Sequence, residues 1–353
     1  MLFVCCISLD VQSQTFLSDT LGINEDGSVI IAKSLALPGW ILGVDVDSTD
    51  NLLFIRYRNL SKNETSLKNK GGISVYSLAD QRMLWQRPVN YFNQDPKLTS
   101  EGVLFVTMGK ATSLLDLKTG NEVWKKKKMI PYWVDAKNRM FLAYKGSYMN
   151  GVSNELEGHS LATGEKMWSR KMSHVYGWNE SGLLDDSTRL IVSDGIHLVH
   201  MGNGEGPSYA MPTGASDYKE AVALGALGVV TGVLTGFAAV PTGPKKVMEL
   251  VSNVLSDDTV FYVASRENLF CLDRQLQPKW GYPIPDGMGS RSHLFARGDS
   301  LYMINMGTGY RNTIFDTSEA YAHEYLRLKV GWPFIACFDK RKGEKLSLIH
   351  ISE

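Results

Sequence analysis

The chain has 353 residues, of which 44% are hydrophobic and 21% are charged, as in ordinary folded globular proteins. Lys plus Arg and Asp plus Glu both number 37, so the formal net charge is zero. Proteins that bind nucleic acid usually carry a basic excess, so this balance argues against such a partner. The four lysines at 125–128 form the one basic block. We interpret them as a solvated edge strand, with a phosphate or anionic-lipid patch as the alternative.

The N-terminus, MLFVCCISLDVQSQTF, is apolar and then polar. Val11 and Ser13 are small enough to suit signal-peptidase cleavage before Gln14. We therefore predict that residues 1–13 are the end of a signal peptide whose start lies upstream, and that the protein is exported to the periplasm or the cell exterior. The alternative is a buried first strand. The following SVIIAKSLAL is expected to be a strand donated to the last blade of a closed fold.

A motif of an apolar strand, a tight turn and a Trp recurs along the chain. The best copies are SLLDLKTGNEVW and EGHSLATGEKMW. A polar turn followed by an apolar strand also recurs six times, first as DSTDNLLFI. Units of about 40 residues with three or four short strands predict an all-β fold, a β-propeller of four-stranded blades with six visible repeats. The Trp position of the six copies is filled by Trp85, Trp124, Trp168, Ser208, Trp280 and Ser347.

The turn before two of these tryptophans contains Gly120 or Gly164. Glycine accepts a positive φ, so we expect a tight turn there, and we expect each Trp to fill the space between one blade and the next. These copies resemble the repeat of the PQQ-like (quinoprotein-like) β-propellers, A-x-D-x-x-T-G-x-x-x-W, and the resemblance covers about residues 39 to 350. It implies seven or eight blades in the full protein. The WD40 alternative has less support, since no Gly-His and Trp-Asp pairs recur.

Two insertions stretch the spacing of the repeats. The first Trp intervals are 39 and 44 residues, but the intervals that end at Trp280 and Ser347 are 72 and 67, which places insertions at about 214–246 and 307–331. Within the second, TSEAYAHEYLRL predicts a short amphipathic helix. Insertions in propellers fall on one face, often the binding face.

The first insertion contains an uncharged Gly/Ala-rich stretch at 221–240, AVALGALGVVTGVLTGFAAV. Gly228, Gly232 and Gly236 would share one face of a helix, the small-residue spacing by which helices approach closely. Three interpretations remain open: an element packed on the propeller, a membrane-surface or partner-docking element, and a membrane span.

The last residues, LSLIHISE at 346–353, begin where the sixth Trp is expected. They resemble the translation of a sequencing adapter. We predict that the chain from about residue 346 is not native and that the propeller is truncated.

Quinoprotein dehydrogenases of the resembling family hold PQQ with a stacking Trp, a vicinal disulfide, Ca²⁺ and an Asp base. The vicinal pair Cys5-Cys6 falls in the predicted leader, so the resemblance does not bring the cofactor with it, and we predict neither PQQ nor calcium. His197 and His200 are expected on opposite faces of a strand, which disfavours a shared metal. The acidic turn DVDSTD and its recurring relatives favour turn chemistry over a Ca²⁺ loop.

These observations predict an exported propeller that acts as a non-catalytic binding or protein-interaction scaffold. Its partner would be another protein or a cell-envelope component, and the resembling family includes an outer-membrane assembly lipoprotein. A PQQ-dependent alcohol or sugar dehydrogenase is one alternative. A membrane-associated module that works through residues 221–240 is the other.

Overall fold

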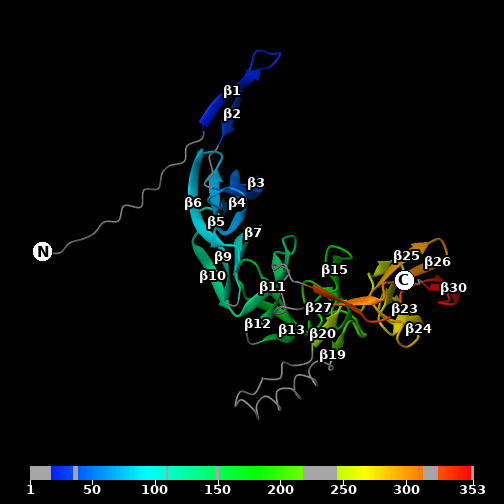
Figure 1. Cartoon of the computed structure of the whole chain (residues 1–353). Helices are drawn as coiled ribbons and strands as arrows, with labels where there is room; N and C mark the ends of the chain where they lie inside the picture. Colours follow the sequence, from blue (N-terminus) through cyan, green and yellow to red (C-terminus); the bar gives the residue numbers. More distant parts are fainter. Residues whose placement is uncertain are drawn as a thin grey trace, which may run out of the picture. The chain divides into compact units, whose positions relative to one another are not determined.

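The computed structural model describes residues 17–34, 39–108, 110–147, 151–217, 245–312 and 325–350. Every regular element in these ranges is a β-strand, which confirms the predicted all-β class (Figure 1). Within the same ranges, no helix has the length and apolar character needed to cross a membrane. The predicted signal peptide at 1–13 and the glycines Gly228, Gly232 and Gly236 lie outside the described residues.

Each of the six predicted repeats corresponds to one four-stranded antiparallel sheet, which we call a blade. Blade 1 contains β3 (Trp40–Asp47), β4 (Leu52–Leu60), β5 (Leu67–Ser77) and β6 (Arg82–Asn90). Blade 2 contains β7 (Gln94–Thr99), β8 (Gly102–Thr107), β9 (Ala111–Leu115) and β10 (Glu122–Lys127). Blade 3 contains β11 (Met129–Asp135), β12 (Met140–Ser147), β13 (Gly151–Ser160) and β14 (Lys166–Lys171).

The later blades follow the same plan, except that the sixth is interrupted by an insertion. Blade 4 contains β15 (Glu180–Leu183), β16 (Thr188–Val192), β17 (Gly195–His200) and β18 (Ser208–Ala210). Blade 5 contains β21 (Leu255–Ser256), β22 (Val260–Ala264), β23 (Asn268–Asp273) and β24 (Pro278–Pro283). Blade 6 contains β25 (Ser292–Arg297), β26 (Ser300–Asn305), β29 (Phe334–Asp339) and β30 (Lys345–His350).

Burial differs between the middle and the last strand of a blade. The middle strands β9 and β22, with sequences ATSLL and VFYVA, are buried at every residue, as expected of strands covered on both faces. The last strands β10 and β24 are exposed at alternate positions. The repeat's Trp position falls on the last strand of all six blades, and the four tryptophans there are buried or half-buried, whereas Ser208 and Ser347 are exposed.

The polar turns before the second strands are held by aspartate side chains. Asp185 Oδ1 accepts hydrogen bonds from the backbone of Ser187 at 2.7 Å and Thr188 at 2.8 Å. Asp257 makes the same bonds to Thr259 and Val260, both at 2.9 Å. In the DVDSTD segment, Thr49 N donates to an Asp47 oxygen at 3.0 Å. These bonds agree with the interpretation of the acidic segments as turns.

A seventh four-stranded sheet comes from the flanks of the two insertions. Its order is β19 (Ala215–Asp217), β20 (Lys245–Met248), β27 (Thr308–Asn312) and β28 (Tyr325–Lys329). The helix predicted across 317–328 is therefore wrong for its last residues, because Tyr325 pairs with Asn312 in a strand. The alternating sequence YLRLK suits a strand that has a partner available.

The N-terminal segment forms a hairpin of its own, from β1 (Leu17–Ile23) and β2 (Val29–Ser34). The donated strand predicted at this place is wrong, because Val29 pairs with Ile23 across a short turn. Gly27 has a φ of 80° in that turn and donates its N–H to Asn24 O at 2.9 Å. A local turn of this kind makes the nearby strand the first partner to pair.

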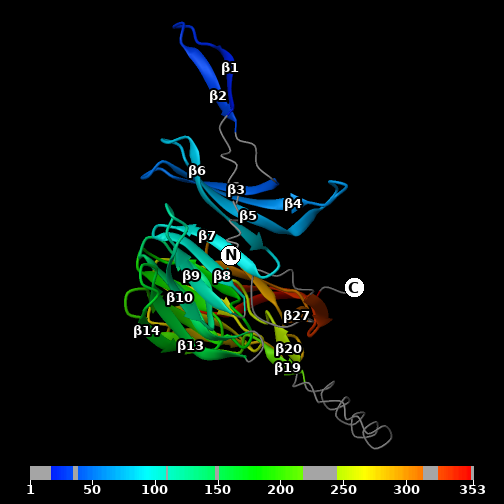
Figure 2. The same ribbon diagram turned by 90° about the vertical axis from the view of Figure 1, so that its left-hand side faces the viewer.

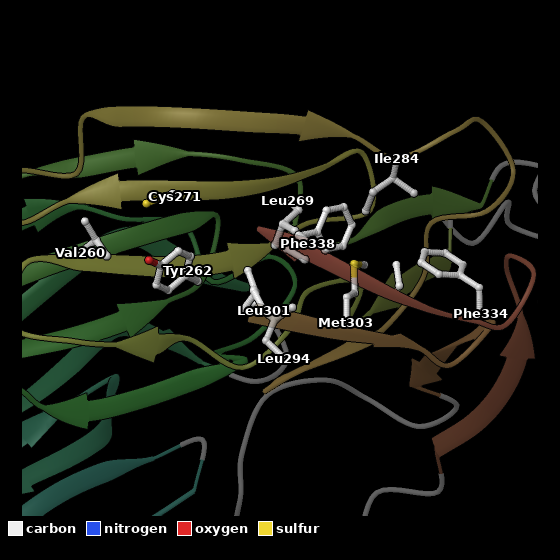
Figure 3. Close-up of a cluster of buried hydrophobic side chains, with 12 residues drawn as sticks. Val260, Tyr262, Leu269, Cys271, Ile284, Leu294, Leu301, Met303, Phe334 and Phe338 are labelled. Carbon is white, nitrogen blue, oxygen red and sulfur yellow. The ribbon is translucent and has the colours of Figure 1, made fainter. Parts of the chain in front are cut away.

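The chain divides into two compact units, one made of 1–139 with 160–165 and the other of 140–159 with 166–353. In the first, Phe54, Val75 and Phe105 belong to a core formed by blades 1 and 2; Figure 2 shows the blade 1 strands side by side. In the second, the core of blades 5 and 6 includes Tyr262, Leu294 and Phe338, and the side chains labelled in Figure 3 fill the space between the strands.

Candidate functional site

The four tryptophans of the repeat lie against glycines in the turn of the following blade. A Cβ atom at Gly120 would lie 2.7 Å from the Trp85 ring, and one at Gly164 would lie 2.7 Å from the Trp124 ring. A Cβ atom at Gly204 would lie 2.4 Å from the Trp168 ring, and one at Gly343 would lie 2.4 Å from the Trp280 ring. A contact this close leaves no room for any side chain at these glycines.

Three of the tryptophans are also fixed by a hydrogen bond. The Nε1 atoms of Trp85, Trp124 and Trp168 each donate at 2.8 Å, to Leu117 O, Leu161 O and Met201 O respectively. Each acceptor lies three residues before the contacted glycine. The indole of Trp280 is different, since its buried Nε1 has no acceptor among the described residues.

Blade 4 breaks the pattern, because Ser208 stands at its Trp position. The turn of blade 5 also differs, because it is one residue shorter: Leu276 N bonds Asp273 O, three residues back, whereas Gly120 N bonds Asp116 O, four residues back. Leu276 there has a φ of 59° and is 1% exposed, whereas blades with a preceding Trp have Gly at the positive-φ residue. The turn glycine is therefore found where a Trp covers it, and the shorter turn of blade 5, which follows a blade without a Trp, has a buried leucine at its positive-φ residue.

A polar cavity of about 160 Å³ lies in the second unit, at the starts of the first strands of blades 4, 5 and 6. Asn179 and Glu180 come from the start of β15, Asn253 from the segment before β21, and Arg291 and Ser292 from the start of β25. Asn253 is fixed by a two-way bond with Leu294, accepting from its N–H at 2.8 Å and donating to its carbonyl at 3.2 Å. The cavity wall is therefore held by side-chain bonds between blades.

The charges around this cavity are of both signs. Glu180 accepts a hydrogen bond from Val254 N at 2.5 Å, and burial raises the pKa of the Glu180 carboxyl above its ordinary value. Glu249 and Arg291 form an ion pair at 3.0 Å, and the Arg291 guanidinium lies 5.2 Å from the centre of the Tyr310 ring. The contacts with Glu249 and with the Tyr310 ring together fix the orientation of the Arg291 side chain.

Asn179 supplies an unused hydrogen-bonding group. Both polar atoms of its side chain are buried, and neither has a partner among the described residues. An unpaired buried amide is costly, so such a group calls for an occupant that both donates and accepts. A peptide unit has that pattern, and so has water.

The sequence motifs gave no sign of this cavity, because its residues do not recur in the repeat. The nearest signal was the aromatic stretch Tyr176-Gly177-Trp178 directly before Asn179. Trp178 Nε1 donates to the Tyr144 hydroxyl at 3.2 Å, which fixes the chain at this point.

The described residues do not fit a PQQ and calcium site. No group of three or more His, Cys, Asp or Glu side chains in the described ranges is arranged to hold a metal ion. His197 is buried and His200 is exposed, as expected of opposite faces of β17. Cys271 and Cys337 are free thiols, and burial raises the pKa of Cys271 to about 11. The Cys5-Cys6 pair lies outside the described residues.

Four-stranded antiparallel blades in series, four of which end in a strand whose Trp packs on the turn of the next blade, define a PQQ-like β-propeller. The PQQ_2 family model, described as outer membrane protein assembly factor BamB, matches residues 62–277, more than half of the chain. The chain belongs to this family.

Several solved structures are similar to the chain. BamB from Moraxella catarrhalis has 14% identity and a TM-score of 0.40, over 87% of this chain and 75% of that one. The computationally designed Ika8 protein has 9% identity and a TM-score of 0.35, over 88% and 87%. KlHsv2 with loop 6CD replaced by a Gly-Ser linker has 9% identity and a TM-score of 0.33, over 83% and 99%. No curated protein sequence matches the chain significantly.

Proposed function

We propose that this protein is an exported, non-catalytic propeller that binds other proteins of the cell envelope and serves as a scaffold in the assembly of outer membrane proteins. The observation that carries the proposal is the match of residues 62–277 to a family model described as an outer membrane protein assembly factor. The partner would be a protein of the assembly apparatus, and the location would be the periplasmic side of the outer membrane.

The polar cavity supports a role in protein binding. The unused donor and acceptor of Asn179 match the N–H and C=O of an extended peptide backbone. The volume of about 160 Å³ is on the scale of one amino-acid side chain. A partner loop could therefore place one residue in the cavity while its backbone pairs with the carboxamide.

Aromatic rings next to the cavity add to this support. His293 lines the cavity, and its ring stacks on Phe295 with centroids 6.0 Å apart. Phe295 is 50% exposed. Exposed aromatic rings beside a polar pocket are typical of the central residues of protein interfaces.

The test is a direct binding measurement with the full chain. The protein is immobilised, and a detergent-solubilised outer-membrane assembly complex is passed over it in biolayer interferometry. We expect saturable binding by the wild type and at least a tenfold weaker Kd for Asn179→Leu and Arg291→Ala. The matched control is Arg341→Ala, which removes an arginine that is 81% exposed and distant from the cavity in sequence. Absence of saturable binding by the wild type would refute the assembly role.

A further inference from the structure

A second polar cluster lies in blade 4, where the repeat lacks its Trp. The Oγ atom of Ser208 lies 2.8 Å from His197 Nδ1, and His197 Nε2 lies 2.9 Å from Asp194 Oδ1. Ser208 is exposed, whereas His197 is only 6% exposed. A hydroxyl, an imidazole and a carboxylate are thus in line, with the hydroxyl at the surface.

The partners of the imidazole determine its tautomer. Hydrogen bonds hold the pKa of Asp194 below its ordinary value in spite of burial, so its carboxylate can only accept. His197 Nε2 must then carry the hydrogen, and in the neutral ring Nδ1 is a bare acceptor. That nitrogen is the one that faces Ser208.

Arg170 fixes the direction of the serine hydrogen. Its Nη2 donates to Ser208 Oγ at 2.6 Å, and a guanidinium has no acceptor. The Ser208 hydroxyl must therefore direct its own hydrogen toward His197 Nδ1. The same guanidinium donates to Leu198 O, Gly204 O, Gly206 O and Pro207 O at 2.7 to 3.2 Å, which fixes its position.

One donor lies where a developing oxyanion would form, the backbone N–H of Ser208. Since Leu198 N bonds Pro207 O, the facing pair His197 and Ser208 is a non-hydrogen-bonded pair of the ladder. Ser208 N–H thus points away from β17, and β18 is the last strand of its sheet. A hydrogen-bond donor at this place would stabilise a tetrahedral intermediate. The terminal nitrogens of Arg170 are already used by the four carbonyls and by Ser208 Oγ.

The carboxylate is itself held by the neighbouring chain. Ser173 N donates to Asp194 Oδ2 at 3.1 Å, and Ser193 Oγ donates to Oδ1 at 3.2 Å. These bonds leave Asp194 oriented toward the imidazole, so it acts as a positioning residue.

We propose that Ser208 is a nucleophilic serine that accepts an acyl group from small, activated carboxylic esters, an activity that goes beyond the proposed scaffold function. Ser208 Oγ attacks the ester carbonyl carbon while His197 Nδ1 takes its proton. The tetrahedral intermediate collapses with cleavage of the bond to the alkoxy group, which leaves as the alcohol with the proton returned by His197. The products are acyl-Ser208 and one alcohol, with no change of oxidation state. Small esters are the class that fits, because Ser208 lies at an exposed sheet edge.

The test treats the full chain with a fluorophosphonate probe and with p-nitrophenyl acetate. We expect one label per chain, mapped by peptide mass spectrometry to Ser208, and a burst of one equivalent of nitrophenol. The exposed Ser66, which has no histidine partner among the residues that the structure describes, is the internal control and is expected to stay unlabelled.

Variants separate the roles of the residues. Ser208→Ala is expected to abolish labelling, and His197→Gln to slow it at least twentyfold. Asp194→Asn is expected to slow it at least tenfold without lowering the thermal midpoint, with partial recovery in Asp194→Glu. His200→Gln, on the exposed face of the same strand, is the matched control for direct acylation of a histidine and is expected to react like the wild type. A wild-type chain that labels Ser208 no faster than Ser66, or a His197→Gln variant that stays folded and labels normally, would overturn the proposal.

Discussion

Trp168 and Gly204 form one of the two closest contacts between a repeat Trp and a turn glycine. The Trp168 indole donates to Met201 O at 2.8 Å, and a Cβ atom at Gly204 would lie 2.4 Å from the ring. Gly204 has a φ of 76°, so the turn conformation and the close approach both require glycine. The Trp168 ring packs over the turn that contains Gly204, and the same turn supplies Met201 O as the hydrogen-bond acceptor of the indole.

The first prediction concerns Gly204→Ala. The added methyl group must both adopt a positive φ and displace the Trp168 ring, so we expect a loss of about 2–4 kcal/mol in the free energy of unfolding. Gly298→Ala is the matched control, since Gly298 has a φ of 57° in a hairpin turn of the same unit but nothing within 4 Å of its Cβ position. The control should lose about 1 kcal/mol, because only the strain of placing alanine at a positive φ remains. Urea denaturation of both variants would measure the difference, and equal losses would contradict the role of the ring contact.

A second prediction compares Trp168→Phe with Trp280→Phe. Both changes remove similar ring area, but the first also leaves Met201 O without its donor, whereas Trp280 Nε1 has no acceptor to lose. Trp168→Phe should therefore be the more destabilising by about 1 kcal/mol. The measurement is again the free energy of unfolding in urea, and a larger loss in Trp280→Phe would show that the hydrogen bond does not set the order.

Leu276 gives a third prediction, an inversion of the usual order of alanine and glycine. Leu276 has a φ of 59° and is 1% exposed in the core of blades 4 and 5. Both Leu276→Ala and Leu276→Gly lose the buried side chain, at about 2–5 kcal/mol. The glycine variant also removes the strain that a Cβ atom causes at a positive φ, so it should be the more stable of the two by about 1 kcal/mol. In an ordinary strand alanine would be the more stable, and finding that order here would contradict the argument.

These contacts also show why part of the fold could be predicted from the sequence. The Trp and Gly positions recur along the sequence, because four of the blades meet the next blade through the same contact. The seventh sheet could not be predicted this way. Its strands β19 and β20 are short, and the link from Val247 to Arg311 joins two separate insertions.

The candidate site could not be predicted because nothing in it repeats. Asn179, Asn253 and Arg291 come from different blades and meet only in three dimensions. Ser208 was visible in the sequence only as a missing Trp, and its link to His197 depends on strand register, which a weak repeat does not reveal.

The last prediction concerns the pH dependence of stability through Asp257 in blade 5. Although burial raises the pKa of this carboxyl, hydrogen bonds from Thr259 and Val260 N–H, and the ammonium of Lys340 at 3.2 Å in blade 6, together lower it to about 2. A depressed pKa favours the folded state above the unfolded pKa of about 3.9, and the stabilisation disappears as pH falls through about 2. The side chain is 37% exposed, so after discounting for solvent screening we expect Asp257→Asn to lose about 1 kcal/mol at pH 7. The difference in unfolding free energy between wild type and variant should close between about pH 4 and pH 2 in urea denaturation.

Asp299→Asn, which changes a carboxylate that is 78% exposed in the same unit, should alter stability by less than about 0.5 kcal/mol at pH 7. A gap that stays constant down to pH 2 would show that Asp257 is not the group that titrates.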